Sequence, residues 1–139
     1  MAHAHVIVWL DRRRARVVGC DPTDEFDVVE IRAEHPVERV HRKSGPMGSG
    51  HAPYDADYFD DVADALRDVA EVLIVGPSQT KWAFERFLQK RRPDVARHVV
   101  GVETVDRPTD RELAAFGRHM FVRIDALGLE PGAREGLGS

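Results

Sequence analysis

The sequence predicts an α/β domain in which a mixed β-sheet carries helices on both faces. Two short apolar runs, His5–Leu10 and Val72–Val75, are almost free of charge and indicate strands buried on both sides. Apolar residues at helical spacing follow the second run and indicate a helix packed against the sheet. Strands of this kind usually lie in the middle of a sheet, parallel to a neighbour.

Length and composition bound the class of protein. The chain has 139 residues, 42% hydrophobic and 32% charged, with a net charge of −4, which is typical of one globular domain. No apolar run predicts a membrane span, and the N-terminus lacks the features of a signal peptide. A single cysteine, Cys20, excludes an internal disulfide and fits a reducing compartment. We expect one cytoplasmic domain over residues 1–129, then a disordered tail over 130–139, with no membrane partner.

The first part of the chain predicts a three-stranded antiparallel meander. A polar turn, Asp11–Arg14, joins His5–Leu10 to a second strand, Ala15–Cys20, which makes a hairpin. After another turn, apolar and charged residues alternate over Phe26–Ala33. This alternation indicates a strand with one exposed face, at the edge of the sheet.

Helices and strands alternate in the second part. Helical spacing covers Asp57–Val69, the strand Glu71–Val75 follows, and a second helix covers Gln79–Arg91 with Ser78 as its expected N-cap. Pro93 is expected to stop that helix.

A fifth strand, Val99–Val105, precedes a capping box, Thr109–Glu112, that opens the last helix. The order βββαβαβα with right-handed crossovers is a ribonuclease H-like topology. It predicts the strand order 3-2-1-4-5, with His5–Leu10, Val72–Val75 and Val99–Val105 mutually parallel.

The segment Glu34–Tyr54 has no sustained periodicity and is predicted to be a long, flexible loop. It is rich in glycine and carries the basic residues Arg39, His41, Arg42 and Lys43. Two further basic clusters are Arg12, Arg13, Arg14 and Arg16 on the first hairpin, and Lys90–Arg92 at a helix end, where the helix dipole favours positive charge. The turn Gly76–Lys81 could offer N–H groups and Lys81 to an anion, although it lacks P-loop spacing.

These features resemble a known family. The order of elements, the loop VHRKSGPMGSGH and the strand-turn-helix VLIVGPSQTKWAF resemble the middle domain of eukaryotic and archaeal class-1 peptide release factors and of Pelota ribosome-rescue proteins. The segment Val100–Thr109 is similar to the VGxETVDxPT pattern of short bacterial proteins of the "translational machinery component" type. The resemblance covers about residues 5–125.

The resemblance implies a site in the loop but also a departure from it. Release factors carry Gly-Gly-Gln there, which places a backbone N–H and an amide beside an ester carbonyl so that water attacks. This chain has Gly45-Pro46-Met47 instead. Proline removes an N–H and methionine has no amide side chain, so efficient hydrolysis is not expected.

The leading hypothesis is therefore a non-catalytic module that contacts ribosomal RNA or tRNA phosphates through the loop and the hairpin, without a cofactor. The expected RNA-binding residues are Arg12, Arg13, Arg14, Arg39, His41, Arg42, Lys43, Gly45, Pro46, Met47 and Lys81.

Two alternatives stay open. One is a hydrolase that acts on tRNA esters or is a metal-dependent nuclease; a two-metal nuclease needs several converging carboxylates, and Asp11 alone is well placed. The other is a protein-interaction domain that works as a homodimer and pairs through the edge strand Phe26–Ala33. No metal site is expected, since the histidines lack HxxxH spacing on any helix.

Overall fold

The computed structural model describes residues 4–20, 27–34 and 55–128. The strands are β1 His5–Leu10, β2 Arg14–Gly19, β3 Val28–Arg32, β4 Glu71–Gly76 and β5 Val99–Thr104. The helices are α1 Ala56–Ala65, α2 Thr80–Arg91, α3 Pro93–Ala96 and α4 Asp110–Ala126. Of the predicted loop Glu34–Tyr54, the structure describes only Glu34. The rest of the loop, residues 35–54, and the predicted tail, residues 130–139, lie outside the described residues.

The sheet has the predicted topology. Its five strands lie in the order β3-β2-β1-β4-β5. β1 runs antiparallel to β2 and parallel to β4, and β4 runs parallel to β5, with a register irregularity between Val72 and Leu73. The two apolar runs are thus the central neighbours β1 and β4, as their freedom from charge predicts.

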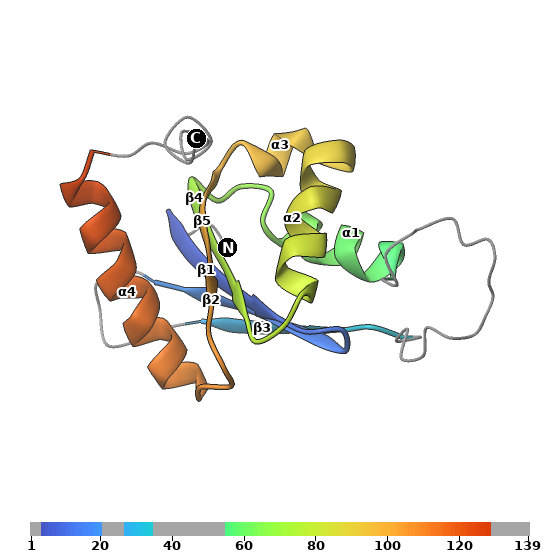
Figure 1. Cartoon of the computed structure of the whole chain (residues 1–139), viewed down its shortest axis with the longest axis horizontal. Coiled ribbons are helices and arrows are strands. Elements are labelled where there is room, and N and C mark those ends of the chain that lie inside the picture. The colour runs from blue at the N-terminus through green and yellow to red at the C-terminus, as the bar shows by residue number, and fades with distance from the viewer. Residues whose placement is uncertain (1–3, 21–26, 35–54, 129–139) are drawn as a thin grey trace.

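Helices cover both faces of the sheet, as Figure 1 shows with α4 on one side and α1, α2 and α3 on the other. Side chains along each strand alternate between two cores. In the first core, the ring of Phe59 on α1 lies 5.2 Å from that of Phe84 and 5.5 Å from that of Phe87 on α2. In the second core, Trp9 lies on the face that α4 covers.

Several element boundaries differ from the sequence prediction. α1 ends at Ala65 rather than Val69, because the chain turns there to enter β4 only six residues later, although Val69 itself is buried. α3 was not predicted. Pro93 does end the preceding helix, but it also opens α3, where its missing N–H costs nothing at the first helical position.

The helix caps divide into one confirmed and one wrong prediction. The capping box of α4 is complete: Thr109 Oγ1 accepts from the N–H of Glu112 at 3.1 Å, and Glu112 Oε1 accepts from the N–H of Thr109 at 2.9 Å. Ser78, by contrast, does not cap α2. The N-cap is Gln79, which has helical backbone angles and no side-chain capping bond.

In the basic cluster at residues 90–92, Lys90 and Arg91 lie in the last turn of α2 as predicted, but Arg92 has a different role. Arg92 lies between three carboxylates, with Nη1 2.7 Å from Asp60 Oδ1 and 3.0 Å from Asp64 Oδ1, and Nε 3.3 Å from Asp94 Oδ1. Arg92 therefore links α1 to the junction of α2 and α3 instead of interacting with a helix dipole.

Within the described ranges, no helix is long and apolar enough to cross a membrane.

Candidate nucleic-acid interface

The β1–β2 turn is built around the carboxylate of Asp11. Its Oδ1 accepts hydrogen bonds from the backbone N–H of Arg13 at 2.8 Å and of Arg14 at 3.0 Å. The N–H of Asp11 donates to the carbonyl of Arg14 at 3.0 Å, which closes the turn. The side chains of Arg12 and Arg13 are exposed and that of Arg14 is partly exposed, so the turn presents three arginines at the carboxyl end of β1.

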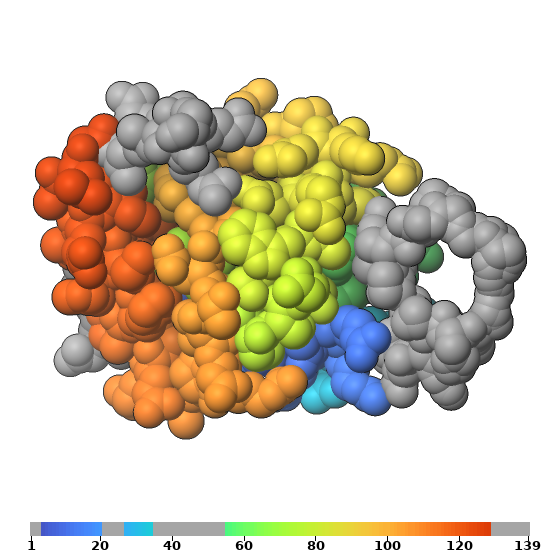
Figure 2. All heavy atoms as spheres, in the orientation of Figure 1, coloured from blue at the N-terminus to red at the C-terminus, as the bar shows by residue number. Residues whose placement is uncertain are grey.

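The segment between β5 and α4 adds a fourth arginine to this end. β5 is an edge strand, whereas α4 packs over β1 and β2, so the segment between them passes along the end of the sheet. Trp9 Nε1 holds this segment in place by donating to the carbonyl of Asp106 at 2.6 Å. Arg107 Nη1 then donates to Asp11 Oδ2 at 2.9 Å while the side chain stays 57% exposed. In Figure 2 the orange surface of this segment meets the blue surface of the hairpin.

The indole of Trp9 is the common support of these arginines. The guanidinium carbon of Arg16 lies 4.5 Å from the ring centroid, that of Arg107 5.3 Å and that of Arg14 5.9 Å. Arg16 itself is buried, and its Nη1 donates to the carbonyl of Pro108 at 2.9 Å and to Asp110 Oδ1 at 2.8 Å. Arg16 is thus a structural residue that fixes the start of α4, whereas Arg107 and Arg14 face outward.

The described chain on either side of residues 35–54 is attached to the same turn. The N–H of Ala33 donates to the carbonyl of Arg13 at 2.8 Å. On the other side, the hydroxyl of Tyr58 donates to the carbonyl of Asp11 at 2.9 Å, and Asp55 caps α1. The predicted loop therefore starts and finishes beside the hairpin arginines. Its own candidate residues lie outside the described residues: Arg39, His41, Arg42, Lys43, Gly45, Pro46 and Met47.

Lys81 differs from the other candidate residues. The expected anion-facing lysine is 3% exposed, and its Nζ donates to the carbonyl of Ser78 at 2.7 Å. Lys81 thus provides a hydrogen-bond donor to a backbone carbonyl of the turn before α2, and burial lowers the pKa of Lys81. The side chain therefore does not reach outward from the carboxyl end of β4.

The contacts of Asp11 account for its titration. Burial acts to raise the pKa of Asp11, but the N–H groups of Arg13 and Arg14 and the guanidinium of Arg107 outweigh it, so the pKa is lower than usual. The carboxylate on which a nuclease would depend is thus occupied by the turn and by Arg107.

We expect Arg107→Gln to raise the pKa of Asp11 towards its ordinary value of 3.8, as measured by NMR titration of the carboxyl group. Because the folded-state pKa is below the unfolded one, ionised Asp11 stabilises the fold above pH 3.8, and this contribution disappears as pH falls through the folded pKa. In the variant the loss should still begin near pH 3.8 but should be smaller and be complete at a higher pH, because only the folded-state pKa has changed. Arg97→Gln, an exposed change at the C-cap of α3, should leave the titration of Asp11 unchanged. An unaltered titration of Asp11 in Arg107→Gln would contradict the assignment.

Comparison with known proteins gives similar solved structures, whereas no family model and no curated protein matches the sequence. A structure described as an archaeal protein shares the fold with a TM-score of 0.50 at 12% identity, over 88% of this chain and 40% of that one. Pelota from Archaeoglobus fulgidus gives 0.49 at 16% identity, over 94% and 39%. The archaeal translation termination factor aRF1 gives 0.45 at 12% identity, over 88% and 41%.

The chain thus spans about two fifths of the length of each of these proteins. At sequence identities of 12 to 16%, the likeness is one of fold.

Arg107 is the surface residue that the sequence analysis missed. It is 96 residues from Asp11 in the chain, and only the crossing of the segment after β5 brings the two together. The nearest available signal was its place inside the Val100–Thr109 segment that carries the family resemblance. Neighbouring basic residues indicate a cluster in a sequence, whereas an isolated arginine does not.

Proposed function

We propose that the protein is a non-catalytic, ribosome-associated module that binds RNA phosphates with the hairpin end of its sheet. The observation that carries the proposal is that four arginines, Arg12, Arg13, Arg14 and Arg107, lie at one end of the sheet. Asp11 holds the turn that carries the first three and binds the side chain of Arg107, and the side chains of Arg14 and Arg107 lie against Trp9. The family resemblance of the sequence supports RNA on the ribosome as the target. Ribosome and tRNA contacts are part of this proposal.

Phosphate is the favoured ligand because of the chemistry of the exposed groups. Guanidinium groups present several N–H donors in a planar fork that matches phosphate oxygens. The protein is negative overall, with a net charge of −4, so polyanion contact should be confined to this end. Three more basic residues, Arg39, Arg42 and Lys43, lie in the sequence between Ala33 and Tyr58, which are both attached to the β1–β2 turn.

The non-catalytic part of the proposal rests on the groups at this end. Asp11 is engaged by two N–H groups and a guanidinium. Burial raises the pKa of Tyr58, and the nearby Asp11 carboxylate raises it further, so the phenol stays protonated and acts as a hydrogen-bond donor. Met47 has no amide to position water. None of these groups is suited to general acid–base work near neutral pH.

The test is the salt dependence of binding to purified ribosomes and to tRNA. Each phosphate contact contributes roughly −0.7 to −0.9 to the slope of log affinity against log salt concentration. The double variant Arg12→Ala/Arg13→Ala should flatten the slope by roughly 1.4 to 1.8, and Arg42→Ala/Lys43→Ala should do the same. Arg97→Ala, which removes an exposed arginine at the C-cap of α3, is the matched control and should leave the slope unchanged.

Absence of binding at low salt, or binding without salt dependence, would end the RNA proposal. Hydrolysis of peptidyl-tRNA by the unaltered protein would restore the hydrolase alternative.

One observation favours a second candidate function, association through a sheet edge. β3 lies at the edge, and Val29 on it is 45% exposed. Ion pairs of Glu30 with Arg32 and Arg14 partly shield that edge from another strand. A concentration-dependent dimer that Val29→Lys abolishes, together with no RNA binding, would put this candidate first.

A further inference from the structure

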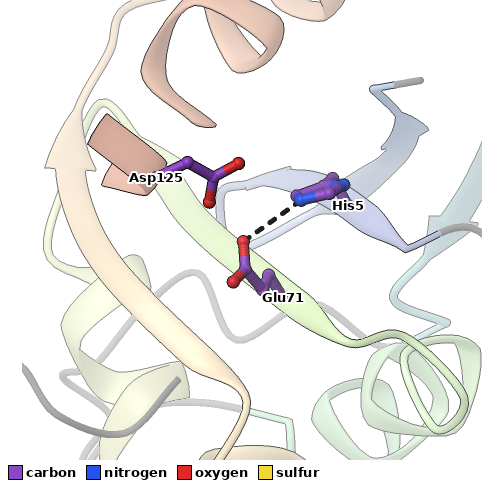
Figure 3. A group of neighbouring side chains, drawn as sticks. All are labelled: His5, Glu71 and Asp125. Atoms are coloured by element: carbon purple, nitrogen blue, oxygen red, sulfur yellow. Dashed lines mark ion pairs between the residues drawn. The ribbon is translucent and has the colours of Figure 1, made fainter. Parts of the chain in front are cut away.

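A second polar cluster lies at the opposite end of the parallel strands, where β1 and β4 begin. His5 is the first residue of β1, Glu71 is the first residue of β4, and Asp125 is in the last turn of α4. Figure 3 shows the three side chains converging from these elements. One donor atom from each residue lies within 4.8 Å of the other two.

The contact between His5 and Glu71 is closer than a chance approach but is not a hydrogen bond. His5 Nε2 lies 3.2 Å from Glu71 Oε1, yet Oε1 is buried without a hydrogen-bond partner. The two atoms therefore lie at ion-pair distance without forming a hydrogen bond. A cation placed beside both atoms would be within bonding distance of each.

The imidazole is also held in position by its own packing. Its ring makes an edge-to-face contact with Phe121 on α4, with centroids 4.9 Å apart and planes at 65°. The N–H of Glu71 donates to the carbonyl of Ala4 at 2.9 Å, which fixes the start of β4 beside β1. Two of the three side chains are thus positioned by the sheet and by α4 before any ligand arrives.

The charge at the cluster is also unbalanced. Two carboxylates face one imidazole, and within the part of the chain that the structure describes no lysine or arginine forms an ion pair with Glu71 or Asp125. A buried carboxylate oxygen without a hydrogen-bond partner is costly. A divalent cation would remove that cost and neutralise both carboxylates.

We propose that His5, Glu71 and Asp125 bind a divalent transition-metal ion, with Zn²⁺ as the expected ion. Imidazole nitrogen suits zinc, whereas Mg²⁺ and Ca²⁺ prefer sites made of oxygen alone. Tetrahedral ligands about 2.1 Å from Zn²⁺ lie roughly 3.4 Å apart, close to the His5–Glu71 separation of 3.2 Å. Asp125 is exposed and has the freedom to close the third side. Water completes the coordination.

Such an ion would join the beginning of β1 and β4 to the end of α4. It would lie at the end of the sheet opposite the hairpin arginines, so it is independent of the proposed RNA contact. Its effect would be to fasten the last turn of α4 onto the second core, where Phe121 and Ile124 are buried. Metal binding to the folded state alone raises the thermal midpoint of unfolding.

The test is metal binding by the full chain after removal of bound metal with a chelator. Zn²⁺ affinity is measured by competition with a chromophoric chelator, and Co²⁺ serves as a spectroscopic probe of four- or five-fold coordination. The unaltered chain should bind one Zn²⁺ and show a higher Tm when it does. Asp125→Asn and His5→Gln should each weaken binding by at least about tenfold and abolish the Tm increase.

The control is His119→Gln, which removes an exposed histidine from α4 about 1.7 turns before Asp125 and should bind Zn²⁺ as the unaltered chain does. Asp125 is at the surface, so its variant keeps the test valid if His5→Gln fails to fold. Unchanged affinity in Asp125→Asn would overturn the proposal, since the chain has seven histidines and zinc would then be held by others. Absence of binding by the unaltered chain would also overturn it.

Discussion

Phe59→Ala should lower the free energy of unfolding by about 3 to 5 kcal/mol, which is the largest loss we expect from a single truncation in the first core. Phe59 is 0% exposed and its ring contacts those of Tyr58, Phe84 and Phe87. The change removes the aromatic contact between α1 and α2 and leaves a cavity that surrounding side chains fill incompletely. Equilibrium urea unfolding followed by circular dichroism measures the loss.

The matched control for this prediction is Phe116→Ala. Phe116 is on α4 and only partly buried against the second core, so the same truncation should cost clearly less. Equal losses in the two variants would mean that burial does not rank these sites and that the α1–α2 contact is not the main aromatic support of the fold.

Trp9→Ala should cost about as much, roughly 3 to 5 kcal/mol, and should also weaken RNA binding in the molecules that remain folded. Trp9 is 0% exposed, and its ring supports Arg16 and Arg107 while its N–H holds the carbonyl of Asp106. Without the indole, the segment that carries Arg107 loses its attachment to β1. Urea unfolding gives the stability, and binding is measured with tRNA below the unfolding transition.

Two variants make this prediction specific. Trp9→Phe keeps an aromatic ring beneath the arginines and removes the hydrogen bond to Asp106, so it should cost less, with about 1 kcal/mol from that bond. Trp82→Ala removes the other tryptophan, which is only partly buried, and should leave RNA binding unchanged. If Trp9→Ala and Trp82→Ala weaken binding equally, Trp9 does not position the interface.

The sheet was predictable because the burial of a strand determines the pattern of apolar and charged residues along it. The uncharged runs that form β1 and β4, together with the alternation in β3, identified the central and edge strands. The capping box of α4 was predictable because it is a local exchange of hydrogen bonds within four residues. Helix ends were less predictable: α1 stops early where the chain turns towards β4, and this depends on the position of the sheet.

The candidate site was predictable where its residues are neighbours in the chain. Arg12, Arg13 and Arg14 are neighbours in one turn, and the structure keeps them at the carboxyl end of β1. The inward course of Lys81 was missed because the competing acceptor is the carbonyl of Ser78, a backbone group that a side-chain pattern does not reveal.

The role of Arg92 was missed for a different reason. Its partner Asp60 is 32 residues away in the chain, and such pairs appear only when helices meet.

The attachment of Ala33 and Tyr58 to one turn has a consequence for how this protein evolves. Their partners, the carbonyls of Arg13 and Asp11, are two residues apart, so the scaffold itself holds together the chain on both sides of residues 35–54. Closing a flexible connection costs only about 0.6 kcal/mol more for each doubling of its length. Insertions, deletions and substitutions between these attachments should therefore destabilise the fold little. The segment can diverge in sequence while the sheet stays the same.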